Sequence, residues 1–327
     1  MNKLIISVSP HIKDKSSTSS IMRDVVIALI PSLIASLFIF GMRALVVTAV
    51  CVISALISEL VFEKLCRRAI TIGDFSAVVT GMLLAFNLPV SIPLWQAAFG
   101  SVVAIVVVKQ LFGGIGMNFA NPAITARIVM LVAFSGTMTS WVSPVGNILS
   151  FGADFTATAT PLVQTAATPK LLDLFLGNIG GSLGETCSLA LIIGFIYLLA
   201  RRVITPHIPV VFVATVFVMF LIFPYEVVGG PTSVGFTYYL LSATEQILSG
   251  GLLLGAIFMA TDYVTSPVTS LGKIIFGIGC GLITFAIRRF GTLPEGVSYA
   301  ILFMNIITPY INNWTAIKAF GGVTDEK

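Results

Sequence analysis

Six ionisable residues lie inside or beside apolar stretches of this sequence: Glu59, Asp74, Lys109, Glu185, Glu245 and Asp262. A charge in hydrocarbon is costly, so such a residue usually marks a binding site, an ion pathway or a proton relay. A second interpretation applies to Glu59, Asp74 and Lys109, because a charged side chain near a helix end can reach the membrane surface. These residue types predict a polar site, or a path for ions or protons, inside a membrane.

Two acidic residues stand in sequences typical of a broken helix. Asp262 is followed by Thr265 and Pro267. A proline frees backbone groups within a membrane segment, and neighbouring hydroxyl side chains can satisfy them. Glu295 lies between a proline and a glycine, as in a re-entrant turn. Both carboxylates are therefore candidates for contact with a ligand or an ion.

A glycine-rich turn is a further candidate for ligand contact. Gly113 and Gly114 are followed by Asn121 and Pro122. Glycine lets a backbone approach a ligand closely, but it also lets membrane helices pack closely. No strand precedes the glycines, so they do not form a dinucleotide-binding fingerprint.

The amino-acid composition indicates whether this chain lies in water or in a membrane. Of its 327 residues, 57% are hydrophobic and 10% are charged, whereas soluble domains carry about 25% charged residues. We therefore expect an all-α polytopic membrane protein. Four scattered cysteines and two histidines predict no metal site. No nucleophile with a partner base is recognisable, so no catalytic residue is assigned, and nothing indicates nucleic-acid binding.

The two halves of the chain share one interrupted pattern. Pro89 is followed 24 positions later by Gly113, and Pro267 is followed 24 positions later by Gly291. Paired interruptions of this kind point to a site between inverted repeats, although two apolar stretches can also match by chance. The pattern predicts about ten transmembrane helices in two inverted five-helix repeats with broken helices.

Lysines and arginines in the short loops predict that both termini are cytoplasmic. The predicted division is a cytoplasmic N-terminal segment (1–21), a first five-helix repeat (22–134), an extracytoplasmic loop (135–181), a second five-helix repeat (182–312) and a cytoplasmic tail (313–327). The loop is rich in threonine and too long to be a simple connection, so a functional role is expected.

Several motifs follow one another along nearly the whole chain. They are Ser9-Pro10-His11, Gly73-Asp74-Phe75-Ser76, Lys109-Gln110-Leu111-Phe112-Gly113-Gly114, Asn121-Pro122-Ala123, Gly184-Glu185-Thr186, Ala260-Thr261-Asp262 and Pro294-Glu295-Gly296. In this combination the chain resembles the family that contains the D subunit of the Rnf complex and the B subunit of sodium-pumping NADH:quinone reductase.

The resemblance implies a multi-pass subunit in a prokaryotic plasma membrane, within a complex that couples electron flow between ferredoxin and NAD to sodium or proton translocation. Such a subunit is part of a translocase and is not catalytically complete alone. The implied partners are the other subunits, the lipid bilayer and a flavin transferase. The implied cofactors are a covalent FMN and a second, non-covalent flavin of the riboflavin type.

In this family the FMN phosphate is joined to a threonine in a segment of the form Asp-x-x-Ser/Thr-Gly-Ala-Ser/Thr. The matching stretch begins at Asp154, and Ala159 and Thr160 also fit, whereas Ala157 and Thr158 replace the serine and glycine. The resemblance therefore implies Thr160 as the acceptor, with Thr158 as the second choice. It also makes Asp262, Glu295, Asp74 and the Gly113 turn candidate flavin or ion contacts.

Two other functions remain open. A channel or transporter for a small polar solute would also use inverted repeats, because a fold does not fix a function. A scaffold subunit that has lost its cofactor would explain the altered attachment segment. Detection of bound flavin would distinguish a flavin-carrying subunit from both of these alternatives.

Overall fold

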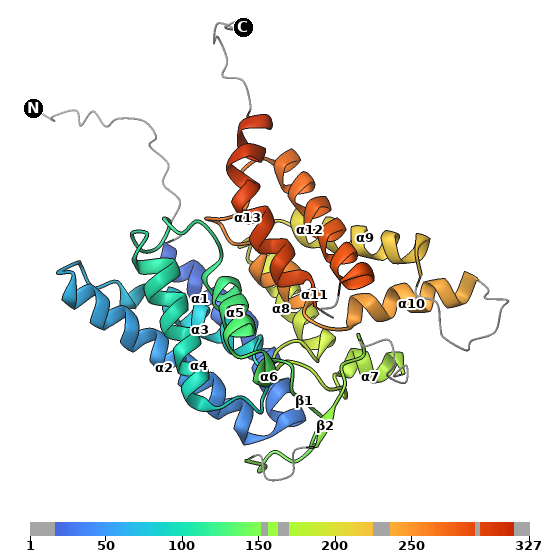
Figure 1. Cartoon of the computed structure of the whole chain (residues 1–327). Coiled ribbons are helices and arrows are strands. Elements are labelled where there is room, and N and C mark those ends of the chain that lie inside the picture. Colours follow the sequence, from blue (N-terminus) through green and yellow to red (C-terminus); the bar gives the residue numbers. More distant parts are fainter. Residues whose placement is uncertain (1–16, 152–155, 163–169, 225–235, 292–294, 317–327) are drawn as a thin grey trace, which may run out of the picture.

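The computed structural model describes residues 17–151, 156–162, 170–224, 236–291 and 295–316. In this part of the chain nearly all regular structure is helical, and the one exception is a short two-stranded ribbon. Elements α1 to α6 form one half of the molecule and α8 to α13 the other (Figure 1). The predicted all-α class is confirmed.

The first half consists of α1 (Thr18–Phe40), α2 (Met42–Leu65), the 3-10 turn η1 (Ile72–Asp74), α3 (Ser76–Phe86), α4 (Leu94–Val102), the π-helical segment η2 (Val103–Gln110), α5 (Pro122–Ala133) and α6 (Ser135–Met138). Local sequence explains the helix starts. The Ser17 hydroxyl accepts from the backbone N–H of Ser20 at the start of α1, and Asn121 caps α5 ahead of a proline in its first turn.

The ribbon pairs β1 (Trp141–Val142) with β2 (Ala157–Thr158). The rest of the chain forms α7 (Leu171–Leu176), α8 (Ser188–Ala200), α9 (His207–Ile222), α10 (Phe236–Leu248), α11 (Leu252–Leu254), the π-helical segment η3 (Gly255–Met259), α12 (Ser270–Phe290) and α13 (Val297–Trp314). The predicted loop 135–181 therefore contains α6, the ribbon and α7. Helix α1 begins within the predicted segment 1–21.

Three described helices, α1, α2 and α12, are long and apolar enough to cross a membrane by themselves. Residues Tyr238–Leu248 and Leu252–Met259 together form a fourth apolar stretch, bent by 62° at its break. The shorter apolar helices are α3, α4 with η2, α5, α8 and α9. Broken helices are thus a feature of the described chain, while the number of ten crossings stays a prediction.

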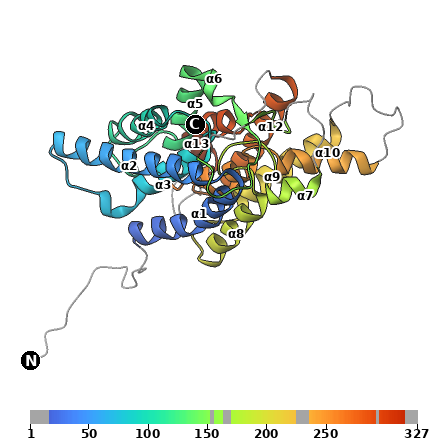
Figure 2. The same cartoon turned by 90° about the horizontal axis from the view of Figure 1, so that it is seen from below.

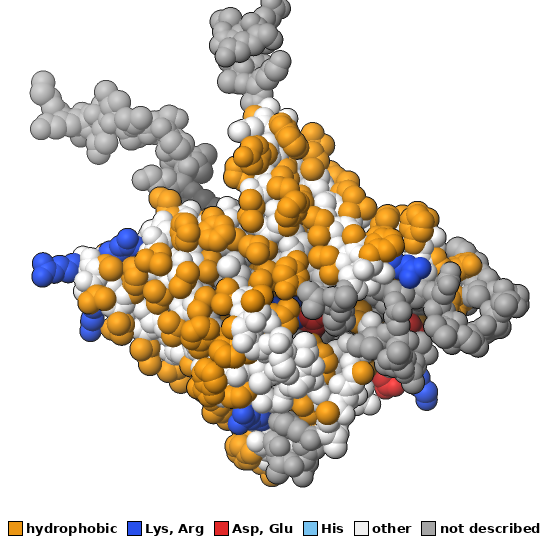
Figure 3. All heavy atoms as spheres, in the orientation of Figure 1, with side chains coloured by type: hydrophobic (Ala, Val, Ile, Leu, Met, Phe, Trp, Pro, Cys, Tyr) orange, Lys and Arg blue, Asp and Glu red, His pale blue; other side chains and the backbone are white. Residues whose placement is uncertain are grey.

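The outer surface agrees with a lipid environment. Ile53 and Ile57 on α2 and Ile196 on α8 are more than half exposed. Figure 3 shows apolar side chains spread across both halves, with Lys and Arg side chains mostly at the margins. A soluble monomer rarely exposes apolar patches larger than a few hundred Å², so this surface is suited to acyl chains.

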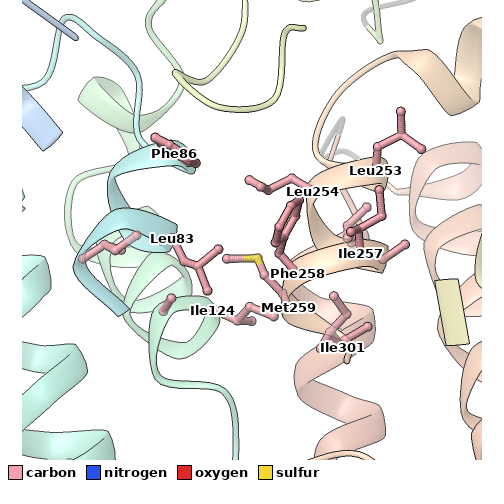
Figure 4. Close-up of a cluster of buried hydrophobic side chains, with 14 of the residues drawn as sticks. Leu83, Phe86, Ile124, Leu253, Leu254, Ile257, Phe258, Met259 and Ile301 are labelled. Carbon is pink, nitrogen blue, oxygen red and sulfur yellow. The ribbon is translucent and has the colours of Figure 1, made fainter. Parts of the chain in front are cut away.

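The core joins the two halves. Helix α1 packs on α8, and α5 packs on α13. Figure 4 shows Met259 between Leu83 and Ile124 of the first half and Phe258 and Ile301 of the second. Helix α3 of the first half and the π-helical segment η3 of the second half therefore meet at the centre of the molecule. Viewed from below, α2 and α10 lie at opposite extremes with α1, α5 and α13 between them (Figure 2).

Helix α1 connects two ends of the fold. Its 23 residues span about 34 Å at 1.5 Å per residue. At its C-terminal end, the Val145 N–H donates to the Ile39 carbonyl at 2.9 Å, and the Met42 N–H donates to the Ile148 carbonyl at 2.8 Å. The start of α1 and the end of α13 lie at one end of the molecule, and β1 and β2 lie at the other (Figure 1).

Candidate functional site

Two pockets lie between the halves. We call the larger one the α1 pocket, because residues of the first turns of α1 line it. It encloses about 820 Å³, including its open part. Its lining residues include Met22, Val25, Ser76, Thr80, Lys109, Ile115, Asn118, Asn121, Phe258, Thr261 and Asp262. These side chains come from both halves, so the pocket exists only when the halves are packed together.

The glycine turn positions one wall of the α1 pocket. Gly113 and Gly114 have φ values of +125° and +99°, a region that other residues rarely adopt. This turn reverses the chain after η2, and it brings Ile115 and Asn118 to the pocket. The two glycines themselves support the wall and are not among its lining residues.

Asn121 and Asp262 lie on this pocket from opposite halves. The Asn121 Oδ1 accepts from the backbone N–H groups of Ala123 at 3.0 Å and Ile124 at 3.3 Å. Asp262 Oδ2 accepts from the Thr265 hydroxyl at 3.1 Å. The structure thus brings together two residues that the sequence analysis proposed separately.

The ionisable residues of α2 and η2 also converge here. The Lys109 ammonium donates to Glu59 Oε1 at 2.5 Å and to the Ser76 hydroxyl at 2.6 Å. Glu59 is fully buried, and Lys109 is 3% exposed. The interpretation that these two charges reach the membrane surface is therefore wrong. Asp74 is partly exposed, and its carboxylate accepts from the Ser76 hydroxyl.

The second pocket, which we call the β1 pocket, has about 450 Å³ of empty space, including its open part. Its lining residues are Arg127, Ile128, Leu131, Met138, Thr139, Trp141, Glu295, Ser298 and Tyr299. The β1 pocket therefore lies against the ribbon, whereas the α1 pocket lies at the opposite end of α1. A predicted ligand contact, Glu295, belongs to this second pocket.

Arg127 organises the β1 pocket. Its guanidinium forms an ion pair with Glu295 and lies 3.4 Å from Glu185 Oε1. It also donates to Asn87 Oδ1 at 3.1 Å and to the Ser298 hydroxyl at 2.8 Å. One buried arginine therefore joins α3, α5, α13 and the turn before α8. The sequence analysis missed Arg127, although an arginine inside an otherwise apolar helix is the signal that could have found it.

Glu185 reaches this cluster because its turn docks on the end of α3. The Leu183 N–H donates to the Leu88 carbonyl at 3.1 Å, and the Gly184 N–H donates to the Phe86 carbonyl at 3.0 Å. The Glu185 carboxylate is buried, and neither of its oxygens accepts a hydrogen bond within the described residues. The Arg127 charge offsets its burial.

The predicted attachment segment lies beside the β1 pocket. Thr158 pairs with Trp141 in the ribbon, and Trp141 lines the pocket. Thr158 and Ala159 are exposed, whereas Thr160 is 3% exposed and its hydroxyl has no partner in the described chain. Asp154 lies outside the described residues. Of the candidate residues, Asn121 and Asp262 therefore line the α1 pocket, and Glu295 lines the β1 pocket.

The side chains that line the two pockets are of the chemical kinds found in ligand sites. Ligand pockets typically have apolar walls and a few polar groups, and the linings of both pockets have this character. A buried hydroxyl without a partner, as at Thr160, is a chemically suitable phosphoester acceptor. No group of three His, Cys, Asp or Glu side chains in the described ranges is arranged to hold a metal ion.

Comparison with known proteins identifies the family. Residues 5–321 match the NQR2, RnfD, RnfE family. The chain is 46% identical to the D subunit of the Na(+)-translocating ferredoxin:NAD(+) oxidoreductase complex of Acetobacterium woodii, over 97% of this chain and 95% of that protein. It is 39% identical to the D subunit of the proton-translocating ferredoxin:NAD(+) oxidoreductase complex of Clostridium ljungdahlii, over 98% and 97%.

A third relative is the D subunit of the ion-translocating oxidoreductase complex of Halorhodospira halophila, 33% identical over 98% of this chain and 96% of that protein. The similarity extends over both halves, both pockets and the loop between them. The chain belongs to the NQR2, RnfD, RnfE family.

Proposed function

We propose that this chain is the flavin-carrying membrane subunit of an ion-translocating ferredoxin:NAD oxidoreductase complex in a prokaryotic plasma membrane. The observation that carries the proposal is the pair of pockets at opposite ends of α1. One of them is lined by Trp141, the ribbon partner of Thr158, which lies two residues before the buried Thr160 hydroxyl. The names of the relatives support the assignment to such a complex. The partners are its other subunits and a flavin transferase.

The β1 pocket is the proposed site of a covalent FMN attached to Thr160. When bound, the flavin supplies the electron-transfer chemistry, and the protein supplies position, charge and water exclusion. Trp141 and Tyr299 offer aromatic surface, and Arg127 offers a cation held by Glu185 and Glu295. Arg127 would favour negative charge on a bound ring system.

The α1 pocket is the proposed site of the second flavin, of the riboflavin type. Its walls are mainly apolar, and its polar groups include Asn118, Asn121, Asp262 and Lys109 as well as several hydroxyl side chains. This combination suits a molecule that has one apolar ring edge and one edge with hydrogen-bonding groups. With both termini in the cytoplasm and residues 135–181 outside, the two flavins would lie toward opposite membrane faces.

Relatives named for sodium and for proton translocation both align with nearly the whole chain. We therefore propose that the subunit takes part in ion translocation. Whether the ion is sodium or a proton has to be measured with the whole complex. The transporter and scaffold alternatives require no flavin at either pocket.

The decisive experiment is mass spectrometry of the subunit from the purified complex, with fragmentation of the peptide that contains Thr158 and Thr160. We expect the mass of FMN less one water on Thr160, complete loss in Thr160→Ala and retention in Thr158→Ala. Detection of FMN on Thr158 alone would show that Thr158, and not Thr160, is the attachment point. A bare peptide together with no releasable flavin would replace this proposal with the transporter or scaffold function.

A further inference from the structure

Helix α2 ends with an arginine where a glycine is usual. The Arg68 N–H donates to the Glu63 carbonyl at 2.8 Å, and the Arg67 N–H donates to the Lys64 carbonyl at 3.2 Å. This pair of bonds is a Schellman motif, whose left-handed position glycine normally fills. Arg67 holds that position with a φ of +53°. A side chain strains this backbone conformation, and strain of this kind is a reason to look for a function at the site.

The turn after α2 exposes three cationic side chains. We call them the basic end of α2: Lys64, Arg67 and Arg68. The acidic side chains nearby are engaged in contacts of their own. Glu63 is buried, and its carboxylate accepts from the Thr71 N–H at 3.1 Å. Asp74 is partly exposed and accepts from the Ser76 hydroxyl at 2.5 Å. The fully exposed charge here is therefore positive, and Figure 3 shows Lys and Arg side chains at this margin of the molecule.

Arg68 is held in one orientation. Its guanidinium donates to the backbone carbonyl of Gln110 at 3.0 Å, and its central carbon lies 5.7 Å from the centre of the Phe62 ring. A carbonyl and an aromatic face leave the net positive charge of the guanidinium uncompensated. The planar guanidinium carries five N–H donors, a geometry that matches phosphate oxygens. The basic end of α2 thus combines one fixed guanidinium with two further cations.

An apolar face of α2 leads to this basic end. Ile53, Ile57 and Val61 follow one another at intervals of four residues, and each is more than half exposed. Leu65, beside the cations, is 80% exposed. The 24 residues of α2 span about 36 Å at 1.5 Å per residue, which exceeds the hydrocarbon thickness of about 30 Å. Acyl chains can therefore lie along this face while the basic end lies at the level of the headgroups.

We propose that the basic end of α2 binds the headgroup of an anionic phospholipid, whose acyl chains lie along the exposed apolar face of the same helix. Net negative charge is what the site selects, because a zwitterionic headgroup would bring its own cation close to three others. An acidic soluble protein would be attracted by the cations but would gain nothing from an apolar face that continues into the hydrocarbon. The inference goes beyond the proposed function and is independent of what the two pockets bind.

The test measures lipid binding to the full chain purified in detergent, by native mass spectrometry. The probes are phosphatidylglycerol and phosphatidylcholine with the same acyl chains. Arg67→Gly is the informative variant, because it removes one cation and also relieves the left-handed strain. We expect phosphatidylglycerol to bind about fivefold more weakly, which corresponds to about 1 kcal/mol for one cation near an anionic surface. Phosphatidylcholine binding should not change, and the melting temperature should stay the same or rise.

Arg202→Gly is the matched control. Arg202 follows α8 with a φ of +56°, in the same left-handed position, but its neighbour Arg201 is already paired with Asp24. We expect the same effect on stability and little change in phosphatidylglycerol binding. Equal weakening in both variants would indicate general attraction to positive charge and overturn the site. Phosphatidylglycerol binding that Arg67→Gly leaves unchanged would also overturn it, and loss of a partner subunit from the complex in that variant would then assign the surface to a protein.

Discussion

The Asn121 amide donates to the backbone carbonyl of Met259 at 3.2 Å, across 138 positions of sequence. Met259 is the last residue of η3, so this carbonyl belongs to a helix end where acceptors lack helical partners. The same side chain caps α5 with its oxygen. One asparagine therefore starts a helix of the first half and ties it to the broken helix of the second.

Replacement of Asn121 separates these two tasks. Asn121→Asp should keep the cap and lose the bond to Met259, because a carboxylate accepts but does not donate. Asn121→Ala should lose both, with about 1 kcal/mol from the cap alone. We expect melting temperatures in detergent to fall in the order wild type, Asp, Ala. Equal melting temperatures for wild type and Asn121→Asp would mean that the bond to Met259 contributes nothing.

Arg127 should be the most sensitive charged residue at the β1 pocket. Arg127→Met leaves Glu185 and Glu295 without their cation, and breaking a buried pair typically costs about 3–5 kcal/mol. The matched control is Arg201→Met. Arg201 pairs with Asp24 but is 52% exposed, and such pairs contribute about 0–1 kcal/mol. Thermal unfolding of both purified variants compares them, and similar shifts would contradict the buried network.

Close approach of α1 and α8 depends on Gly194. A Cβ there would overlap the Ala28 carbonyl oxygen and lie 2.8 Å from Phe258 Cζ. Gly194→Ala should therefore destabilise the fold by about 1–3 kcal/mol through overpacking. Gly136 is also helical, but nothing lies within 4 Å of its Cβ position. Gly136→Ala should leave the melting temperature unchanged or raise it, and loss of stability in this control would refute the steric explanation.

Because Thr160 is buried, we expect the flavin to be attached before this segment folds. A transferase needs access to the hydroxyl, but the folded segment buries it. We expect flavin transfer to an isolated peptide with residues 150–170 to be at least about tenfold faster than transfer to the folded chain. Fluorescence of the denatured products measures both rates. Equal rates would show that the folded segment opens freely.

Some properties could be read from residue types alone. High hydrophobic content predicted a membrane protein, and broken helices were predicted and are found at the bend of 62° after α10 and in the π-helical segments η2 and η3. The paired Pro89/Gly113 and Pro267/Gly291 instead flank α4 with η2 and α12. Asp262 and Asn121 could be chosen because polar groups beside prolines in apolar sequence are unusual. These signals are local, and their physical basis is the cost of a polar group in hydrocarbon.

The sequence by itself determined the membrane environment, the helical class, the presence of interrupted helices and a set of polar candidate site residues. It could do so because hydrophobicity and backbone chemistry act over short stretches. Only the tertiary structure decided that Asn121 and Asp262 share one pocket while Glu295 belongs to another with Arg127. Only it paired Lys109 with Glu59, 50 positions away. Such partners are chosen by helix packing, which brings distant residues together to offset buried charge, and no local pattern specifies that choice.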